Sequence, residues 1–91
     1  MLKVEIKNQF KKDVEKSISS NKDMEKLKEI MLLLVDEKRI PPKNRDHKLQ
    51  GSYKDRRECH LEPDWLIIYK IDQESGTIIF ERTGSHSELF K

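Results

Sequence analysis

The fold is decided by two apolar stretches in the C-terminal third of the chain, WLIIYKI at 65–71 and TIIFERT at 77–83. Both are rich in the β-branched and aromatic residues that pack well on a pleated sheet. The segment between them, 72–76, ends in glycine and has the composition of a hairpin loop. The two stretches are therefore predicted to pair as antiparallel strands, with 65–71 at the centre of the sheet.

Two further strands are predicted upstream of this hairpin. The turn residues Glu-Pro-Asp at 62–64 precede the central strand and follow a short strand at 56–60. At the N-terminus, Leu2, Val4 and Ile6 alternate with charged residues, which is the period of a half-buried strand. The sheet is thus predicted to contain an N-terminal strand and three strands from the second half of the chain.

Two helices are predicted between the first strand and the rest of the sheet. Asn8 is a candidate cap for the first helix and Asn21 for the second. The apolar residues of each helix recur at helical spacing, Phe10, Val14 and Ile18 in the first and Met24, Leu27, Met31 and Leu34 in the second. The continuous apolar run at 30–35 predicts that the second helix is buried on more than one side; a docking surface for a partner chain is the alternative.

The rest of the chain is predicted to be irregular. Pro41 and Pro42 end the helical region, because proline lacks a backbone donor and biases its predecessor toward extended geometry. The segment 43–54 is predicted to be a basic loop, and 86–91 a short tail. Helices on one face of a mostly antiparallel sheet give a small α+β fold, in a single domain that spans 1–91.

Composition excludes several classes of protein. Only 34% of the residues are hydrophobic and 40% are charged, so the core has to be thin. The longest apolar run, at 30–35, is far shorter than the roughly 20 residues that span a bilayer, and the N-terminus lacks the apolar region of a secretion signal. Cys59 is the single cysteine and cannot form an internal disulfide, so we expect a cytoplasmic protein without a membrane association.

A cluster of basic residues lies in the middle of the chain. Between 43 and 57 there are six basic residues and two acidic ones. The basic residues are Lys43, Arg45, Lys48, Lys54, Arg56 and Arg57. Such a cluster favours a polyanionic partner through phosphate contacts and counterion release. A solvated loop without a partner is the alternative, since a chain this charged produces clusters freely.

The second half of the chain also holds all three histidines, His47, His60 and His86. Cleavage of RNA without a metal needs a base for the 2′-hydroxyl, an acid for the leaving 5′-oxygen and a cation for the phosphate. The same region offers these groups and aromatic surfaces for bases: Glu62, Asp64, Trp65, Tyr69, several arginines and Phe90.

Structural interpretations of these residues stay open. Trp65 at the start of an apolar strand suits a core position, and Asp64 after a proline suits a turn. Arg82 could pair with Glu81 or Glu58, and Phe90 could serve only to pack the C-terminus.

Other kinds of site are poorly supported. Cys59 and His60 with His47 and His86 suggest zinc, but the spacings typical of zinc sites are absent and only one thiolate is available. No strand–turn–helix elbow surrounds a serine or the cysteine, and three glycines are too few for a phosphate-binding loop. We therefore expect no metal and no cofactor.

Three blocks of sequence together resemble the YafQ branch of the RelE-type toxins. They are DHKLQGS at 46–52, RECHLEPDWLIIY at 57–69 and RTGSHSELF at 82–90. Any one block alone would be a weak signal, but their order and spacing are specific. The resemblance extends over the full length, because the family pattern is a strand, two helices and then antiparallel strands.

The resemblance implies the toxin of a type II toxin–antitoxin system, a metal-independent endoribonuclease that cuts mRNA on the ribosome. It implies an acid–base set of His47, His60, Asp64 and His86, with Arg82 offsetting charge on the scissile phosphate. It also implies that Phe90 stacks on a base and that Trp65 shapes the site. Either His60 or His86 is expected to be the acid, with Asp64 or another histidine as the base. We further expect Lys48, Lys54 and Arg56 to bind the RNA substrate.

The implied partners are a cognate antitoxin, mRNA and the ribosome. The antitoxin is expected to be small, of the ribbon-helix-helix type, and operator DNA is expected to be bound only through the complex. Two other functions stay open on the residues alone. One is a non-catalytic RNA- or ribosome-binding module, and the other is a purely structural partner that uses the apolar face at 30–35.

Overall fold

Strand β4 (Trp65–Asp72) occupies the centre of a five-stranded sheet with the order β1-β5-β4-β3-β2 in the computed structural model, which describes residues 1–90. It pairs antiparallel with β3 (Arg57–Glu62) on one side and with β5 (Thr77–Gly84) on the other. The α+β class and the central position of 65–71 are thus confirmed. Residues 65–69 are all buried, because both faces of this strand are covered.

The two edge strands differ from the expectation. β1 (Lys3–Ile6) pairs parallel with β5 and makes the sheet mixed, and Val4 and Ile6 are 49% and 38% exposed. The prediction of a half-buried strand is therefore wrong in its burial, because β1 is an edge strand. β2 (His47–Lys48) pairs antiparallel with β3 inside the segment predicted to be a loop, and two residues are too short to leave a periodic pattern.

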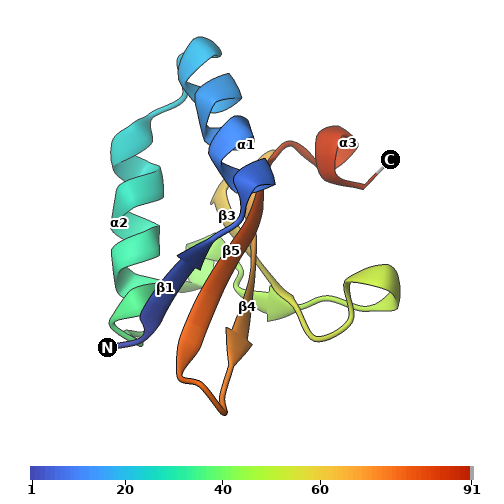
Figure 1. Cartoon of the computed structure of the whole chain (residues 1–91). Coiled ribbons are helices and arrows are strands. Elements are labelled where there is room, and N and C mark those ends of the chain that lie inside the picture. Colours follow the sequence, from blue (N-terminus) through green and yellow to red (C-terminus); the bar gives the residue numbers. More distant parts are fainter. Residues whose placement is uncertain (91) are drawn as a thin grey trace.

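Helices α1 (Asn8–Ser19) and α2 (Met24–Val35) cover one face of the sheet, as Figure 1 shows. Neither asparagine caps its helix. Asn8 is the first residue of α1, and Asn21 has a left-handed φ of 59° where the chain leaves that helix. Asp23 caps α2 instead, since its side chain accepts a hydrogen bond from the backbone N–H of Glu25 at 3.0 Å.

The buried faces of the helices are narrower than predicted. Phe10 of α1 is buried, but Ile18 is 56% exposed, and the polar residues Asp13 and Ser17 are buried in its place. In α2 the buried residues are Leu27, Ile30 and Leu34. Leu32 is 54% exposed, so the prediction that α2 is buried on more than one side is wrong for the face that carries this residue.

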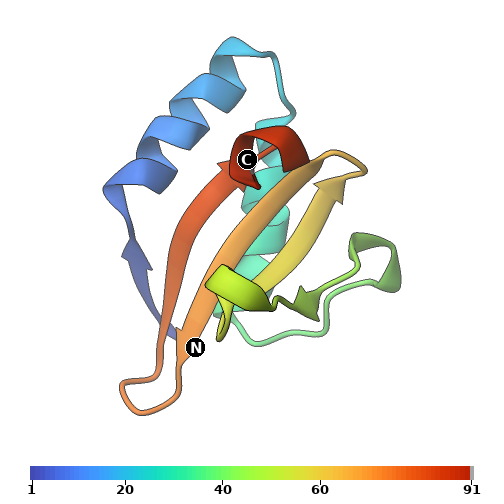
Figure 2. The ribbon, with the colours of Figure 1, turned by 90° about the vertical axis from the view of Figure 1, so that its right-hand side faces the viewer.

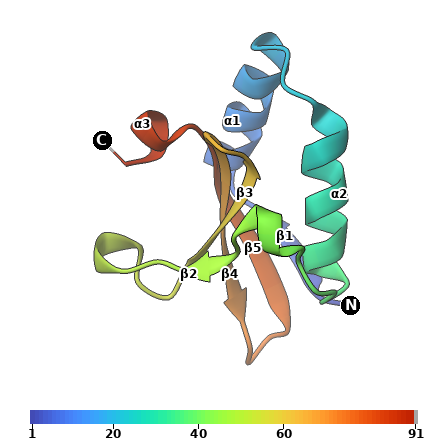
Figure 3. The same ribbon diagram turned by 180° about the vertical axis from the view of Figure 1, so that it is seen from behind.

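The other face of the sheet carries the C-terminal helix α3 (His86–Leu89) and the short helix η2 (Gly51–Tyr53) (Figures 2 and 3). A second 3-10 helix, η1 (Pro42–Asn44), precedes β2. Leu89 packs with Leu66 and Ile68 in a small apolar cluster on this face. The tail predicted at 86–91 is therefore a helix as far as Leu89, and Lys91 lies outside the described residues.

A local motif explains why α3 forms at all. The side chain of Ser85 accepts a hydrogen bond from the backbone N–H of Glu88, and the Glu88 carboxylate accepts one from the backbone N–H of Ser85. This capping box satisfies donors at the start of a helix that is too short to be stable by itself. None of the helices in residues 1–90 is long and apolar enough to cross a membrane.

Candidate active site

The three histidines meet on the face of the sheet that lies opposite α1 and α2. Cys59 and Leu61 of β3 point into the core below these helices, so His60 between them points to the other face. The ring centroid of His60 lies 6.1 Å from that of His47 and 5.6 Å from that of His86. His60 is 4% exposed and stands at the centre of this histidine cluster.

Strand register explains why residues so distant in sequence meet. His60 of β3 is paired with Leu66 of β4, and Leu66 is paired with Gly84 at the end of β5. The chain turns into α3 two residues after Gly84, and His86 is the first residue of that helix. A single row across three strands therefore brings His60 and His86 to the same end of the sheet, as antiparallel pairing predicts.

Asp64 fixes the position of His86. Its Oδ1 lies 2.8 Å from Nδ1 of His86 and accepts a hydrogen bond from the backbone N–H of the same residue at 2.9 Å. The hydrogen bond from this N–H holds the pKa of Asp64 below its ordinary value, and the bond with the ring acts in the same direction. The carboxylate thus stays ionised and orients the ring through Nδ1, which leaves Nε2 for a reacting group.

His47 is held between two acceptors. Its Nδ1 lies 2.7 Å from the carbonyl oxygen of Arg45, and its Nε2 lies 3.1 Å from Oε2 of Glu58. Glu58 is opposite His47 in the β2–β3 pair and is 4% exposed. The same carboxylate oxygen lies 3.9 Å from Nε2 of His60, so Glu58 contacts two of the three imidazoles.

His60 has a different environment. Burial lowers its pKa, and the nearby cation of Arg45 acts in the same direction, while Glu58 opposes the shift. Nη2 of Arg45 lies 3.1 Å from Nε2 of His60. Because a guanidinium can only donate, Nε2 is the acceptor and carries a lone pair. The imidazole of His60 is therefore neutral at neutral pH.

The cluster also contains a possible set of metal ligands. Donor atoms of Glu58, His60 and His86 lie within 4.8 Å of one another. This set differs from the one considered on sequence, because Cys59 faces the core and burial raises the pKa of its thiol to about 12. One carboxylate and two imidazoles suit a transition metal such as zinc or copper.

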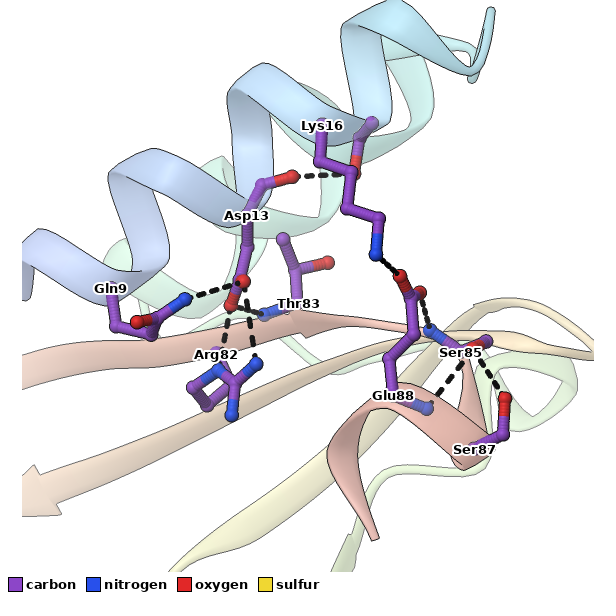
Figure 4. Close-up of polar contacts among 9 residues, drawn as sticks. Gln9, Asp13, Lys16, Arg82, Thr83, Ser85, Ser87 and Glu88 are labelled. Carbon is purple, nitrogen blue, oxygen red and sulfur yellow. Dashed lines mark hydrogen bonds and ion pairs between the residues drawn. The ribbon is translucent and has the colours of Figure 1, made fainter. Parts of the chain in front are cut away.

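Arg82 binds neither Glu81 nor Glu58, the partners considered on sequence. Its Nε lies 2.8 Å from Oδ2 of Asp13 in α1, and its Nη2 lies 3.4 Å from Oδ1. Hydrogen bonding to this carboxylate raises the pKa of Arg82. Glu81 forms an ion pair with Arg56 instead. Figure 4 shows Arg82 directed from β5 toward α1.

The two candidate aromatic platforms are placed differently. Phe90 is 40% exposed, with its ring 6.2 Å from that of His86 and edge-on to Tyr53 at 5.3 Å. Trp65 is 1% exposed and belongs to the main core, which agrees with its structural interpretation. A ring this deeply buried presents no face to a nucleobase. Trp65 can therefore shape the site only through its packing in the core.

The predicted substrate-binding cations fall into two groups. Lys48 and Lys54 are exposed, and no ion pair within residues 1–90 involves either of them. Arg56 binds Glu81, and Arg57 binds Asp46 with its Nε 3.3 Å from Oδ1. Part of the basic cluster is thus held by the protein itself, and Lys48 and Lys54 are free to meet a polyanion.

Sequence reasoning missed two partners of the site. Glu58 precedes His60 by two residues on a strand, so alternation alone places both on one face. That signal was available in the sequence. Asp13 carries no such signal, because it lies 69 residues from Arg82 and occupies a helix face predicted from its apolar residues.

A family model described as "Bacterial toxin of type II toxin-antitoxin system, YafQ" matches residues 2–91. The chain is 44% identical over 88 residues to an Escherichia coli K12 protein described as "mRNA interferase toxin YafQ", a match that covers 96% of this chain and 94% of the relative.

Two solved structures have the same fold at full length. The toxin in the E. coli DinJ-YafQ toxin-antitoxin complex is 42% identical, with a TM-score of 0.90 and complete coverage of both chains. A metal-bound toxin from Helicobacter pylori is 41% identical, with a TM-score of 0.93 and coverage of 99% of this chain and 100% of that one.

Proposed function

This chain belongs to the YafQ family of bacterial toxins of type II toxin–antitoxin systems, and from that premise we propose that it is an endoribonuclease that cleaves mRNA. The observation that carries the proposal is the convergence of His47, His60 and His86 on one face of the sheet. The rings of His47 and His86 lie 6.1 Å and 5.6 Å from that of His60. Imidazole exchanges protons near neutral pH, so this cluster suits acid–base chemistry.

The two central histidines are assigned opposite roles. His60 is neutral because burial lowers its pKa. Its Nε2, which accepts from Arg45 in this structure, is proposed as the base that takes the proton from the 2′-hydroxyl once substrate displaces Arg45. Asp64 holds Nδ1 of His86, so Nε2 is the ring nitrogen left to deliver a proton, and His86 is assigned the role of the acid for the leaving group. The 2′-oxygen attacks the phosphorus and the bond to the 5′-oxygen breaks. The products are a 2′,3′-cyclic phosphate and a 5′-hydroxyl.

The remaining site residues are proposed to offset charge on the phosphate or to contact the RNA. Arg82 is proposed to offset the negative charge that builds on the phosphate, and His47 is proposed to donate a further hydrogen bond to the phosphate. Phe90, exposed next to His86, is proposed to stack on a base. Lys48 and Lys54 are proposed to contact phosphates of the RNA backbone. Arg56 is proposed to do the same while it stays ion-paired with Glu81. No step in this scheme requires a metal ion.

The proposed setting follows from the family. We propose that the substrate is mRNA on the ribosome, which places the protein in the cytoplasm. A cognate antitoxin, small and of the ribbon-helix-helix type, is proposed to hold it inactive, as its E. coli relative forms a complex with DinJ. Operator DNA is proposed to be bound only through that complex.

Expression in bacteria tests the proposal. Induction of the wild-type chain should arrest growth and leave cleaved transcripts, and His86→Ala should abolish both effects. Arg39→Ala, a change at an exposed residue to which the scheme gives no role, is the control and should stay toxic. Growth arrest that survives His86→Ala would favour the non-catalytic binding module. Normal growth with the wild-type chain would favour a purely structural partner.

A further inference from the structure

The carboxylate of Asp13 is buried in α1 and joins that helix to the end of β5. It accepts hydrogen bonds from Nε and Nη2 of Arg82, from the backbone N–H of Thr83 at 3.1 Å and from Nε2 of Gln9 at 3.1 Å. Its side chain is 9% exposed. Figure 4 shows these contacts converging on one carboxylate between the helix and the strand.

The pairing uses only one edge of the guanidinium. Arginine offers two bidentate edges, one formed by Nε with an Nη atom and one formed by the two Nη atoms. Asp13 occupies the Nε–Nη2 edge, and no hydrogen bond within residues 1–90 involves Nη1. Figure 4 shows that third nitrogen pointing away from Asp13. The Arg82 side chain is 29% exposed, and the Nη1 end of its second edge makes no hydrogen bond within residues 1–90.

We propose that Asp13 is a positioning residue for RNA cleavage, because it holds Arg82 so that the free guanidinium edge can bind the scissile phosphate. The inference rests on the proposed function, in which Arg82 is the phosphate cation. Without this anchor the arginine would sample many rotamers, and each turnover would lose entropy to order it. The fixed carboxylate orders the side chain before substrate binds.

Asp13 also has a purely structural task. β1 pairs with β5 only as far as Phe80, so the backbone N–H of Thr83 has no neighbouring strand on that side. Asp13 supplies its acceptor. A substitution could therefore act through stability alone, and the test has to separate that effect from an effect through Arg82.

The same face of α1 also contacts the helix that carries His86. Lys16, about one turn after Asp13, forms an ion pair with Glu88 of α3. Glu88 in turn accepts a hydrogen bond from the backbone N–H of Ser85, next to His86. α1 thus contacts both the proposed phosphate cation and the segment that bears the proposed acid.

A double-mutant cycle on single-turnover cleavage of ribosome-bound mRNA tests the proposal, with variants Asp13→Asn, Arg82→Ala and the combination. We expect Asp13→Asn to lower the rate constant at saturating ribosomes by roughly 10- to 100-fold, the scale of a misplaced catalytic group. Its apparent affinity for ribosomes should stay unchanged. In the Arg82→Ala background the same change should have no further effect. Glu15→Gln, an exposed acid of the same helix, should match the wild type.

Two outcomes overturn the proposal. One is wild-type rate in Asp13→Asn, and the other is a combined variant whose loss equals the product of the single losses. Absence of cleavage by the wild-type protein would instead contradict the proposed function. If Asp13→Asn fails to fold, the hydrogen-exchange rate of the Arg82 side chain, measured by NMR on the wild-type protein, tests the proposal instead. The Nε–H of Arg82 should exchange slowly with water, and exchange as fast as in an exposed arginine overturns the proposal.

Discussion

Oδ1 of Asp64 contacts His86 twice, at Nδ1 over 2.8 Å and at the backbone nitrogen over 2.9 Å. One carboxylate oxygen in a turn between two strands thus fixes both the backbone and the ring of a residue 22 positions later in the chain. The contact engages Nδ1 and leaves Nε2 as the ring nitrogen available to a reacting group. Because the site is assembled from such long-range pairs, small changes in these partners should affect catalysis more than stability.

Asp64→Asn should lower cleavage by roughly 100-fold, because an amide carries no negative charge and can impose the wrong tautomer on His86. Asp64 is exposed, so the melting temperature should change little. Single-turnover rates and thermal unfolding measure the two effects. Asp72→Asn, which changes an exposed aspartate at the end of β4, is the matched control. A rate within a few-fold of wild type would remove Asp64 from the acid–base set.

The pH dependence of cleavage should report His60. Its pKa is lowered by burial, so the base becomes neutral, and the rate rises, around a pH below the ordinary 6.5. The three imidazoles interact, so this limb belongs to the cluster as a whole. His60→Gln, which removes the proposed base, should abolish cleavage across the whole pH range. An acid limb centred clearly above 6.5 in the wild-type protein would argue against His60 as the base.

The same shift makes a prediction for stability. Between the lowered pKa and 6.5 the unfolded chain binds more protons than the folded one, so the free energy of unfolding increases with pH in this range. The stabilisation is complete above 6.5 and is lost as the pH falls through the folded pKa. Urea unfolding of wild type and His60→Gln across this range measures it, and parallel curves would contradict the prediction.

Added zinc should inhibit the enzyme. Glu58, His60 and His86 present donors close enough to share one ion, and a bound ion would occupy the proposed base and acid. Micromolar zinc should therefore slow cleavage, excess chelator should restore it, and Glu58→Gln should weaken the inhibition. Stimulation of a chelator-treated sample by zinc would show instead that the metal takes part in the reaction.

Glu88→Gln should destabilise the protein in a pH-dependent way. The hydrogen bond from Lys16, followed by that from the Ser85 backbone, lowers the pKa of Glu88 from 4.5 to about 2. A lowered carboxyl pKa contributes stability above 4.5, and that contribution is lost as the pH falls toward about 2. The difference in melting temperature between wild type and variant should follow this course. Glu29→Gln, at an exposed position, should show none of it.

The sequence predicted the elements whose signal is local. The apolar run at 65–71 identified the central strand because it is buried on both faces, and the histidines and Asp64 were found by type and motif. The two-residue strand β2 and the four-residue helix α3 were missed because they are too short to show a period. α3 depends on the Ser85–Glu88 capping box and on packing against the sheet.

Contacts between distant segments explain the remaining differences. The sequence offers Glu81 and Glu58 as possible partners of Arg82, but a helix from the other end of the chain places Asp13 beside it. Trp65 was weighed both as core and as part of the RNA site, and only its burial separates the two. Such contacts depend on how the helices pack on the sheet. The residue pattern of a single helix or strand carries no information about that packing.

In the proposed reaction, the imidazoles of His47, His60 and His86 act together to break one phosphodiester bond without a metal. The most direct test incubates purified, chelator-treated protein with ribosomes programmed with a defined mRNA and identifies the new ends. The wild type should cut the mRNA to leave a 2′,3′-cyclic phosphate and a 5′-hydroxyl, and both His60→Gln and His86→Gln should lose this cleavage. Intact message, or cleavage that both variants retain, would contradict it.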